Sequence, residues 1–189
     1  AGDIDNGSSD NSGDVTLSIN QTNFDCSNVG SSSIFSFDGV ANASGDEILV
    51  NDPIFSGLTT QTIEAWVRPS SGNNGNEAWV AVRNTVGDAR YSVHINAPAN
   101  TIGIYNSVIG FRTISTSLVA NQWYHVAVVM NSSRTLVYVD GTYVGQISAG
   151  INVNASTTAL SIGSANDVEY YGEKWTGDID DLRIWNTER

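Results

Sequence analysis

Apolar and polar residues alternate in short runs along most of this chain, which is the pattern of half-buried β-strands. The runs lie at residues 15–19, 33–37, 47–50, 62–68, 78–83, 91–96, 101–105, 123–130, 135–140, 160–162 and 178–185. Turn-forming pairs such as Asp38-Gly39 and Asp140-Gly141 separate many of them. No longer stretch has the apolar period of an amphipathic helix. We therefore predict an all-β fold in which two antiparallel sheets pack as a sandwich.

The start of the chain differs from the rest in composition. Residues 1–14 are nearly all Gly, Asp, Asn and Ser, and Ile4 is their one large apolar side chain. Such a segment cannot bury a core. We therefore expect residues 1–30 to be a linker or partial repeat that contributes an edge strand, and residues 31–189 to form the sandwich domain.

The chain is strongly acidic. Its 189 residues include 20 acidic and 8 basic side chains, which give a formal net charge of -12. This charge repels phosphate backbones and anionic lipid, and no apolar run is long enough to span a bilayer, so we expect neither nucleic acid binding nor membrane insertion. The charge suits a protein that holds divalent cations, although solubility alone also explains it.

Cysteine usage and the first residues give little information on compartment. Cys26 is the single cysteine, so an internal disulfide cannot form. The first residues lack the charged and apolar regions of a signal peptide. We expect a monomeric module that is part of a longer chain.

The last predicted strand contains a carboxylate at a position that alternation assigns to the core. Counting by two from Leu182 and Ile184 places Asp180 on their face of the sheet. A buried charge is costly unless a partner neutralises it, and lysine and arginine are scarce here. We therefore predict that Asp180 binds a hard cation such as calcium.

Four side chains are candidates for sugar binding on one sheet face. Alternation leaves Trp79 and Arg83 facing outward in one run, His94 in the next and Tyr105 in a third. Aromatic faces stack on the apolar faces of pyranose rings, and polar groups then fix the hydroxyls. These residues line one outward face if the three strands are neighbours. Packing at the edge of the sandwich is the alternative for Trp79 and Tyr105.

A second candidate for binding is the loop 164–174. Tyr170 and Tyr171 lie there in a polar, acidic segment, and loops at the rim of a sandwich commonly carry binding function. Packing is again the alternative.

Seven segments together resemble the laminin-G-like branch of the concanavalin A-like lectin/glucanase superfamily. They are residues 35–39, 45–50, 62–69, 121–129, 136–141, 161–163 and 177–185. The resemblance implies a jelly-roll sandwich with a concave and a convex sheet. It also implies packing roles for residues inside the family motifs, namely Trp66, Trp123, His125, Trp175 and Trp185.

The resemblance implies a structural calcium ion near the carboxylate of the final strand, which by position is Asp180. Asp38, Gly39 and Asp46 are the candidate partners from the first strand region. Calcium takes six to eight oxygen ligands, so this set is incomplete. Asp38 is alternatively an ordinary turn former in its Asp-Gly pair.

The first residues resemble hyalin-type, immunoglobulin-like repeats of large bacterial surface proteins. The similar segments are 3–10 and 17–30. In such repeats a second cysteine pairs with the one at Cys26, whereas this chain has Ser12 in its place. This resemblance implies a secreted or cell-surface bacterial protein.

No catalytic arrangement is recognisable. Glucanases of the superfamily carry paired carboxylates on one strand, because retaining hydrolysis needs two carboxyl groups flanking the bond. Glu64 stands alone, His94 and His125 lack a metal-ligand spacing, and no glycine-rich phosphate loop is present. We predict a non-catalytic, calcium-stabilised carbohydrate-binding module. The alternative is a protein-adhesion or spacer module without sugar binding, and a glucanase that uses Glu64 is a distant third.

Overall fold

The computed structural model describes most of the sandwich domain. The described residues are 34–40, 47–50, 57–72, 77–85, 88–152, 160–165 and 173–189, with the backbone alone at 84, 85 and 88. The segment 1–30 with its predicted strand, Asp46, Tyr170 and Tyr171 lie outside them. None of the described segments forms a helix with the length and hydrophobicity needed to cross a membrane.

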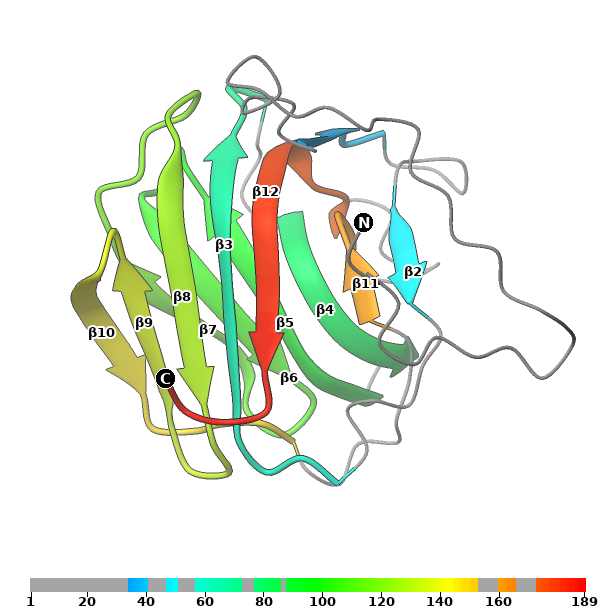
Figure 1. The fold of residues 1–189 in the computed structure, drawn as a ribbon, viewed down its shortest axis with the longest axis vertical. Helices are drawn as coiled ribbons and strands as arrows, with labels where there is room; N and C mark the ends of the chain where they lie inside the picture. The colour runs from blue at the N-terminus through cyan, green and yellow to red at the C-terminus, as the bar shows by residue number, and fades with distance from the viewer. Residues whose placement is uncertain are drawn as a thin grey trace, which may run out of the picture. The chain divides into compact units, whose positions relative to one another are not determined.

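One six-stranded antiparallel sheet contains the first and last described strands (Figure 1). We call it the β3 sheet after a central strand. Its strands, in spatial order, are β1 (Phe35–Asp38), β12 (Thr176–Trp185), β3 (Gln61–Pro69), β8 (Tyr124–Met130), β9 (Thr135–Val139) and β10 (Thr142–Ile147).

The other six-stranded antiparallel sheet lies behind the first in the view of Figure 1. We call it the β5 sheet. Its strands, in spatial order, are β2 (Ile48–Val50), β11 (Leu160–Ile162), β4 (Glu77–Thr85), β5 (Asp88–Asn96), β6 (Thr101–Asn106) and β7 (Gly110–Ser115).

The core lies between the inner faces of the two sheets. Every second residue of β3 and β8 points inward, and Val67, Val126 and Val128 have no exposed surface. The β5 sheet contributes Val93 and Ile95 in the same way. Burying a side chain of this size contributes about 1.5–3 kcal/mol. The apolar alternation therefore decides which face of each strand joins the core.

The predicted fold class is confirmed, since two antiparallel sheets form a sandwich consistent with a concanavalin A-like jelly roll. Two strands were not predicted. In β7 the apolar residues Phe111 and Ile114 lie on opposite faces, so their spacing does not alternate. In β10 a register shift between Tyr143 and Gly145 interrupts the alternation.

A β-bulge in β12 reverses the face of the residues that precede it. The pairing with β3 shifts between Asp180 and Arg183, and Asp181 has a positive φ of 51°. Ile179 is fully buried, so Asp180 points to the outer face, while Leu182 lies against the core beyond the bulge. The prediction that Asp180 faces the core is wrong, because counting by two does not hold across an extra residue.

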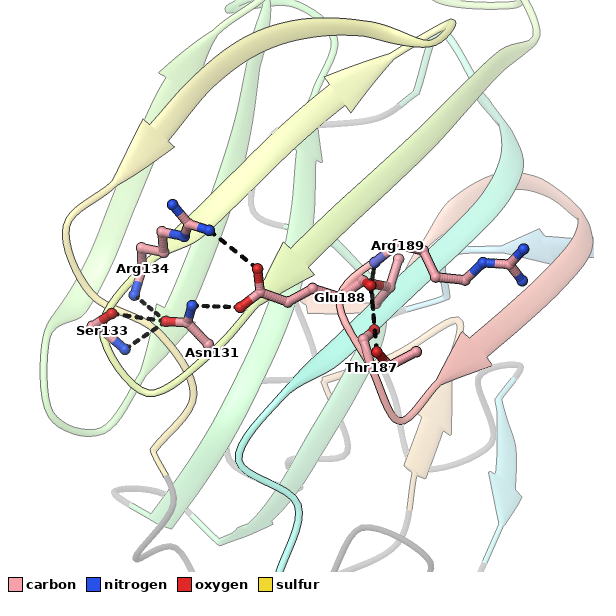
Figure 2. A network of polar contacts seen from close by, with 7 residues as sticks. Asn131, Ser133, Arg134, Thr187, Glu188 and Arg189 are labelled. Atoms are coloured by element: carbon pink, nitrogen blue, oxygen red, sulfur yellow. Dashed lines mark hydrogen bonds and ion pairs between the residues drawn. The ribbon is translucent and has the colours of Figure 1, made fainter.

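The C-terminal residues are held against the start of β3 and the turn between β8 and β9 (Figure 2). The backbone N–H of Arg189 donates to Thr62 Oγ1 at 3.1 Å, and Thr62 Oγ1 donates to the carbonyl of Thr187 at 2.8 Å. Glu188 accepts hydrogen bonds from Asn131 Nδ2 at 2.6 Å and from Arg134 at 3.1 Å. These bonds join the end of the chain to β3 and to the turn between β8 and β9.

Candidate functional site

Two aromatic side chains lie side by side on the outer face of the β5 sheet. Tyr105 of β6 is the direct partner of Phe111 of β7 in the ladder, so both rings point away from the core. Phe111 is 39% exposed and Tyr105 is half-buried. Directly opposite side chains in a sheet are close enough to interact. The pair therefore forms a small, accessible aromatic surface.

The guanidinium of Arg83 of β4 lies over the ring of Tyr105. Its guanidinium carbon lies 5.1 Å from the centroid of Tyr105, within the range of a cation–π interaction. Arg83 Nη1 also forms an ion pair with Glu173 Oε2 at 2.9 Å. Arg83 is 3% exposed. The structure thus brings together the predicted residues Arg83 and Tyr105, but Arg83 acts as a support and offers little surface to a ligand.

His94 of β5 has a similar relationship to Phe111. The two rings meet edge to face, with centroids 5.0 Å apart and an interplanar angle of 81°. His94 Nε2 lies 2.7 Å from the hydroxyl of Ser92, which fixes the orientation of the imidazole. His94 is 1% exposed, so this predicted site residue lies on the expected face of the sheet but beneath the surface.

Trp79 does not belong to this face. It is fully buried in the hydrophobic core, and the pairing of β4 with β5 shifts register between Ala78 and Val80. Trp79 is the extra residue of this bulge, so alternation does not give its direction. The prediction that Trp79 faces outward is wrong, and the alternative of a packing role is the correct one.

Sequence reasoning missed Phe111, Glu173 and Gly103 as parts of this face. Gly103 leaves the space into which the Phe111 ring folds, since a methyl group there would overlap the ring. Phe111 was missed because its strand was not predicted. The combination of an isolated glycine in a predicted strand and a nearby phenylalanine is a signal for such a close approach.

The strand register separates two of the predicted metal ligands, Asp180 and Asp38. Asp38 pairs with Thr176, and Phe35 pairs with Ile179, so Asp180 lies four residues further along β12. Four residues of strand span about 13 Å. Within the described ranges no group of three acidic, histidine or cysteine side chains could hold a metal. Asp180 and Asp38 therefore lie apart along β12, and the calcium site, whose candidate ligand Asp46 lies outside the described residues, stays a prediction.

The neighbouring carboxylates of β12 form ion pairs with arginine. Asp178 Oδ2 lies 2.6 Å from Arg68 Nη2, and Asp181 Oδ2 lies 2.6 Å from Arg183 Nη2. Basic residues are few in this chain, but these two stand directly beside the acids that need them. The low number of lysines and arginines was therefore a poor guide to which acids are paired.

Glu64 has no catalytic partner among the contacts that the structure describes. Its Oε1 accepts a hydrogen bond from Trp185 Nε1 at 3.0 Å. The nearest charged or titratable groups are His125 at 3.8 Å and Arg183 at 3.9 Å. A retaining glycosidase needs a second carboxyl group at the bond to be cleaved. Glu64 instead accepts the hydrogen bond of Trp185 and lies within ion-pair distance of His125 and Arg183.

One buried titratable pair lies away from the candidate site. Burial raises the pKa of Tyr91 well above its ordinary value, while Arg90 and Gln61 oppose this shift. Burial also lowers the pKa of Arg90. These groups belong to β5 and to the interior, so they affect stability at high pH rather than ligand binding.

The Laminin_G_3 family, described as the concanavalin A-like lectin/glucanases superfamily, matches residues 42–189. The chain belongs to this family. Comparison of the sequence with curated proteins gives no match.

Several solved structures share this architecture at low sequence identity. The SAP-like pentraxin from Limulus polyphemus is 21% identical, with a TM-score of 0.60 over 82% of this chain and 76% of that chain. The NanB sialidase from Streptococcus pneumoniae is 15% identical, with a TM-score of 0.64 over 84% of this chain and 26% of that chain. The CBM40 of the Ruminococcus gnavus IT-sialidase, bound to α2,3-sialyllactose, is 12% identical, with a TM-score of 0.61 over 76% of this chain and 91% of that chain.

These similarities show the fold. The present chain therefore corresponds to about a quarter of the sialidase chain and to nearly the whole of the CBM40 module.

Proposed function

We propose that this domain is a non-catalytic carbohydrate-binding module that binds saccharide on the outer face of the β5 sheet. The observation that carries the proposal is the Tyr105–Phe111 pair, in which two accessible rings on adjacent strands are each held by a buried polar side chain. Pyranose rings stack on such aromatic surfaces. Rings that are held in place before binding lose less conformational entropy when the ligand arrives.

Polar groups for the sugar hydroxyls lie around the pair. Thr113 is exposed two residues from Phe111 on β7, and Thr101 is half-buried four residues from Tyr105 on β6. The Glu173 side chain is 22% exposed and is held by Arg83. Ligand sites of this kind combine an apolar surface with a few polar groups that fix orientation. The arrangement is suited to stacking one or two sugar rings with hydroxyls directed to Glu173 and the threonines.

The charge of this face favours neutral saccharides. The arginine beside Tyr105, Arg83, is buried and paired with Glu173, so an anionic sugar stacked on Tyr105 would meet this carboxylate before it met the guanidinium. The Ruminococcus gnavus CBM40 was solved with sialyllactose, which is an acidic sugar. We expect the present module to bind neutral oligosaccharides more tightly than sialylated ones.

A glycan array that contains neutral and sialylated oligosaccharides tests the proposal. Tyr105→Ala and Phe111→Ala are each expected to weaken binding about ten-fold, which corresponds to about 1.4 kcal/mol. Val119→Ala serves as the control, because Val119 is 58% exposed and lies outside this face. Absence of binding to every glycan, or unchanged affinity in both aromatic variants, would contradict the proposal.

Structural calcium and a secreted or cell-surface location remain parts of the proposal that rest on the sequence resemblance. Thermal unfolding in calcium and in chelator tests the ion, because a bound ligand raises the melting temperature by mass action. Equal melting temperatures in the two conditions would argue against calcium. Protein adhesion is the second candidate function, and the exposed aromatic residues of the β3 sheet favour it.

A further inference from the structure

Four aromatic side chains cross the outer face of the β3 sheet on adjacent strands. We call Trp66, His125, Tyr138 and Tyr143 the aromatic stripe. Trp66 of β3 pairs with His125 of β8, with ring centroids 5.5 Å apart, and Tyr138 of β9 pairs with Tyr143 of β10, with centroids 5.7 Å apart. Tyr138 lies opposite Ala127, which is two residues from His125 on β8. Tyr138 and His125 are therefore diagonal neighbours about 7–8 Å apart.

The aromatic stripe is accessible. Trp66 is 42% exposed and Tyr143 is 51% exposed, whereas the family motifs predicted a packing role for Trp66. The His125 side chain is 29% exposed. Single exposed apolar residues are common, but contiguous aromatic surface on a sheet marks an interaction site. This surface lies on the opposite side of the sandwich from the Tyr105–Phe111 pair, since the two sheets pack through their inner faces.

Two carboxylates that have no basic partner among the described residues flank the stripe. Asp180 pairs with Trp66 across β12 and β3, and its Oδ1 accepts the N–H of Asp181 at 2.8 Å. Asp140 lies next to His125 and accepts its backbone N–H at 2.8 Å. Neither carboxylate forms an ion pair within the described part of the chain.

The nearby basic groups are already engaged. Arg68 pairs with Asp178, and Arg183 pairs with Asp181 and approaches Glu64. The row that runs from Asp180 through the aromatic rings to Asp140 therefore carries uncompensated negative charge.

The ring geometry distinguishes between two kinds of ligand. The planes of the two ring pairs are inclined by 66° and 64°, so the stripe is not the flat surface on which a saccharide chain lies. A ring face beside a free carboxylate instead attracts a cation, through the ring quadrupole and through charge pairing. The net charge of -12 adds long-range attraction for a basic partner.

We propose that the aromatic stripe is a docking surface for a basic segment of a partner protein. In this arrangement a lysine or arginine side chain of the partner lies over Trp66 and pairs with Asp180. Tyr138 and Tyr143 supply the aromatic contacts that are typical of protein interfaces. This interaction is independent of saccharide binding on the β5 sheet, so the domain joins a sugar ligand on one face to a protein on the other.

Titration of the isotope-labelled protein with an oligo-arginine peptide tests the proposal. The matched probe is an oligo-citrulline peptide, which has the same shape without the charge. The arginine peptide is expected to shift the indole N–H signal of Trp66 saturably, and added salt weakens the interaction by screening it. Trp66→Leu and Asp180→Asn are each expected to weaken binding about two- to five-fold.

Glu188→Gln is the control variant, because it removes the same charge at an exposed position away from the stripe. It is expected to bind the peptide like the unaltered protein, and thermal unfolding confirms that each variant is folded. Equal binding of the arginine and citrulline peptides would overturn the proposal, as would unchanged affinity in both Trp66→Leu and Asp180→Asn. If neutral oligosaccharides shift the Trp66 signal and the arginine peptide does not, the surface is a second sugar site.

Discussion

The ring of Phe111 lies over the backbone of Gly103, where a methyl group would overlap it. The two residues are on neighbouring strands, and Gly103 pairs with Thr113 while Phe111 pairs with Tyr105. The glycine therefore lets the phenylalanine fold down against the sheet and contact His94. The position of the Phe111 ring in the proposed sugar site therefore depends on residue 103 having no side chain.

Gly103→Ala is expected to displace the Phe111 ring and to weaken saccharide binding about as much as Phe111→Ala. Overpacking of this kind also costs about 1–3 kcal/mol of stability. Chemical denaturation and the affinity for the bound glycan measure the two effects. Gly72→Ala is the control, because a methyl group at Gly72 makes ordinary contacts, and it is expected to change stability by less than about 0.5 kcal/mol. Normal glycan affinity in Gly103→Ala would contradict this account of the Phe111 position.

Trp79→Ala is expected to destabilise the domain by about 3–5 kcal/mol, because it leaves a large cavity in the core. Trp66→Ala, which truncates an exposed tryptophan of the other sheet, is expected to cost less than about 1 kcal/mol. Denaturant unfolding measured by fluorescence compares the two. Similar stability of the two variants would mean that Trp79 is not the core residue described here.

Tyr91 makes the stability depend on pH in the alkaline range. Burial raises the pKa of Tyr91 in the folded state, so the contribution of its protonated form is fully present below the ordinary tyrosine pKa of about 10 and is lost as pH rises above it. Tyr91→Phe is expected to flatten the decline of unfolding free energy above about pH 10. At neutral pH it is expected to be neutral or slightly stabilising, because the buried hydroxyl makes no hydrogen bond of good geometry with a described residue, although Gln61 lies close to it. Denaturant unfolding at several pH values is the measurement, and an unchanged slope would contradict the prediction.

The C-terminal residues are expected to detach from the turn between β8 and β9 at acidic pH. Hydrogen bonds from Asn131 and Arg134 lower the pKa of Glu188, so its bonds are fully formed above the ordinary carboxyl pKa of about 4.3 and are lost as pH falls through the lower folded value. Amide signals of Thr187 and Arg189 in a pH titration report the detachment. In Glu188→Gln the acidic step is expected to disappear. Its persistence in that variant would assign the step to another group.

Alternation identified the strands that have one buried face. In β3, β5 and β8 every second residue is apolar and fully or nearly buried, and the runs that predicted these strands lie within or close to the observed bounds. β7 and β10 were not predicted, because their apolar residues do not alternate. The order of strands in each sheet was not readable, because pairing joins segments that lie far apart in the chain.

The candidate site was predicted in part. Arg83, His94 and Tyr105 were expected on one outward face, and the neighbouring strands β4, β5 and β6 do place them there. Their burial was not foreseen, since it depends on Phe111 and Glu173, which come from segments that the pattern did not connect to this face.

The sequence by itself determined that the chain forms an all-β sandwich. Burial of one face of each strand requires apolar residues at every second position, and this pattern is visible in the sequence. Tertiary structure alone decided the directions of Trp79 and Asp180. At each of these positions the partner strand forces one extra residue into the ladder, and a single extra residue exchanges the two faces of everything beyond it. A bulge is a property of two paired strands, so the alternation within one strand cannot reveal it.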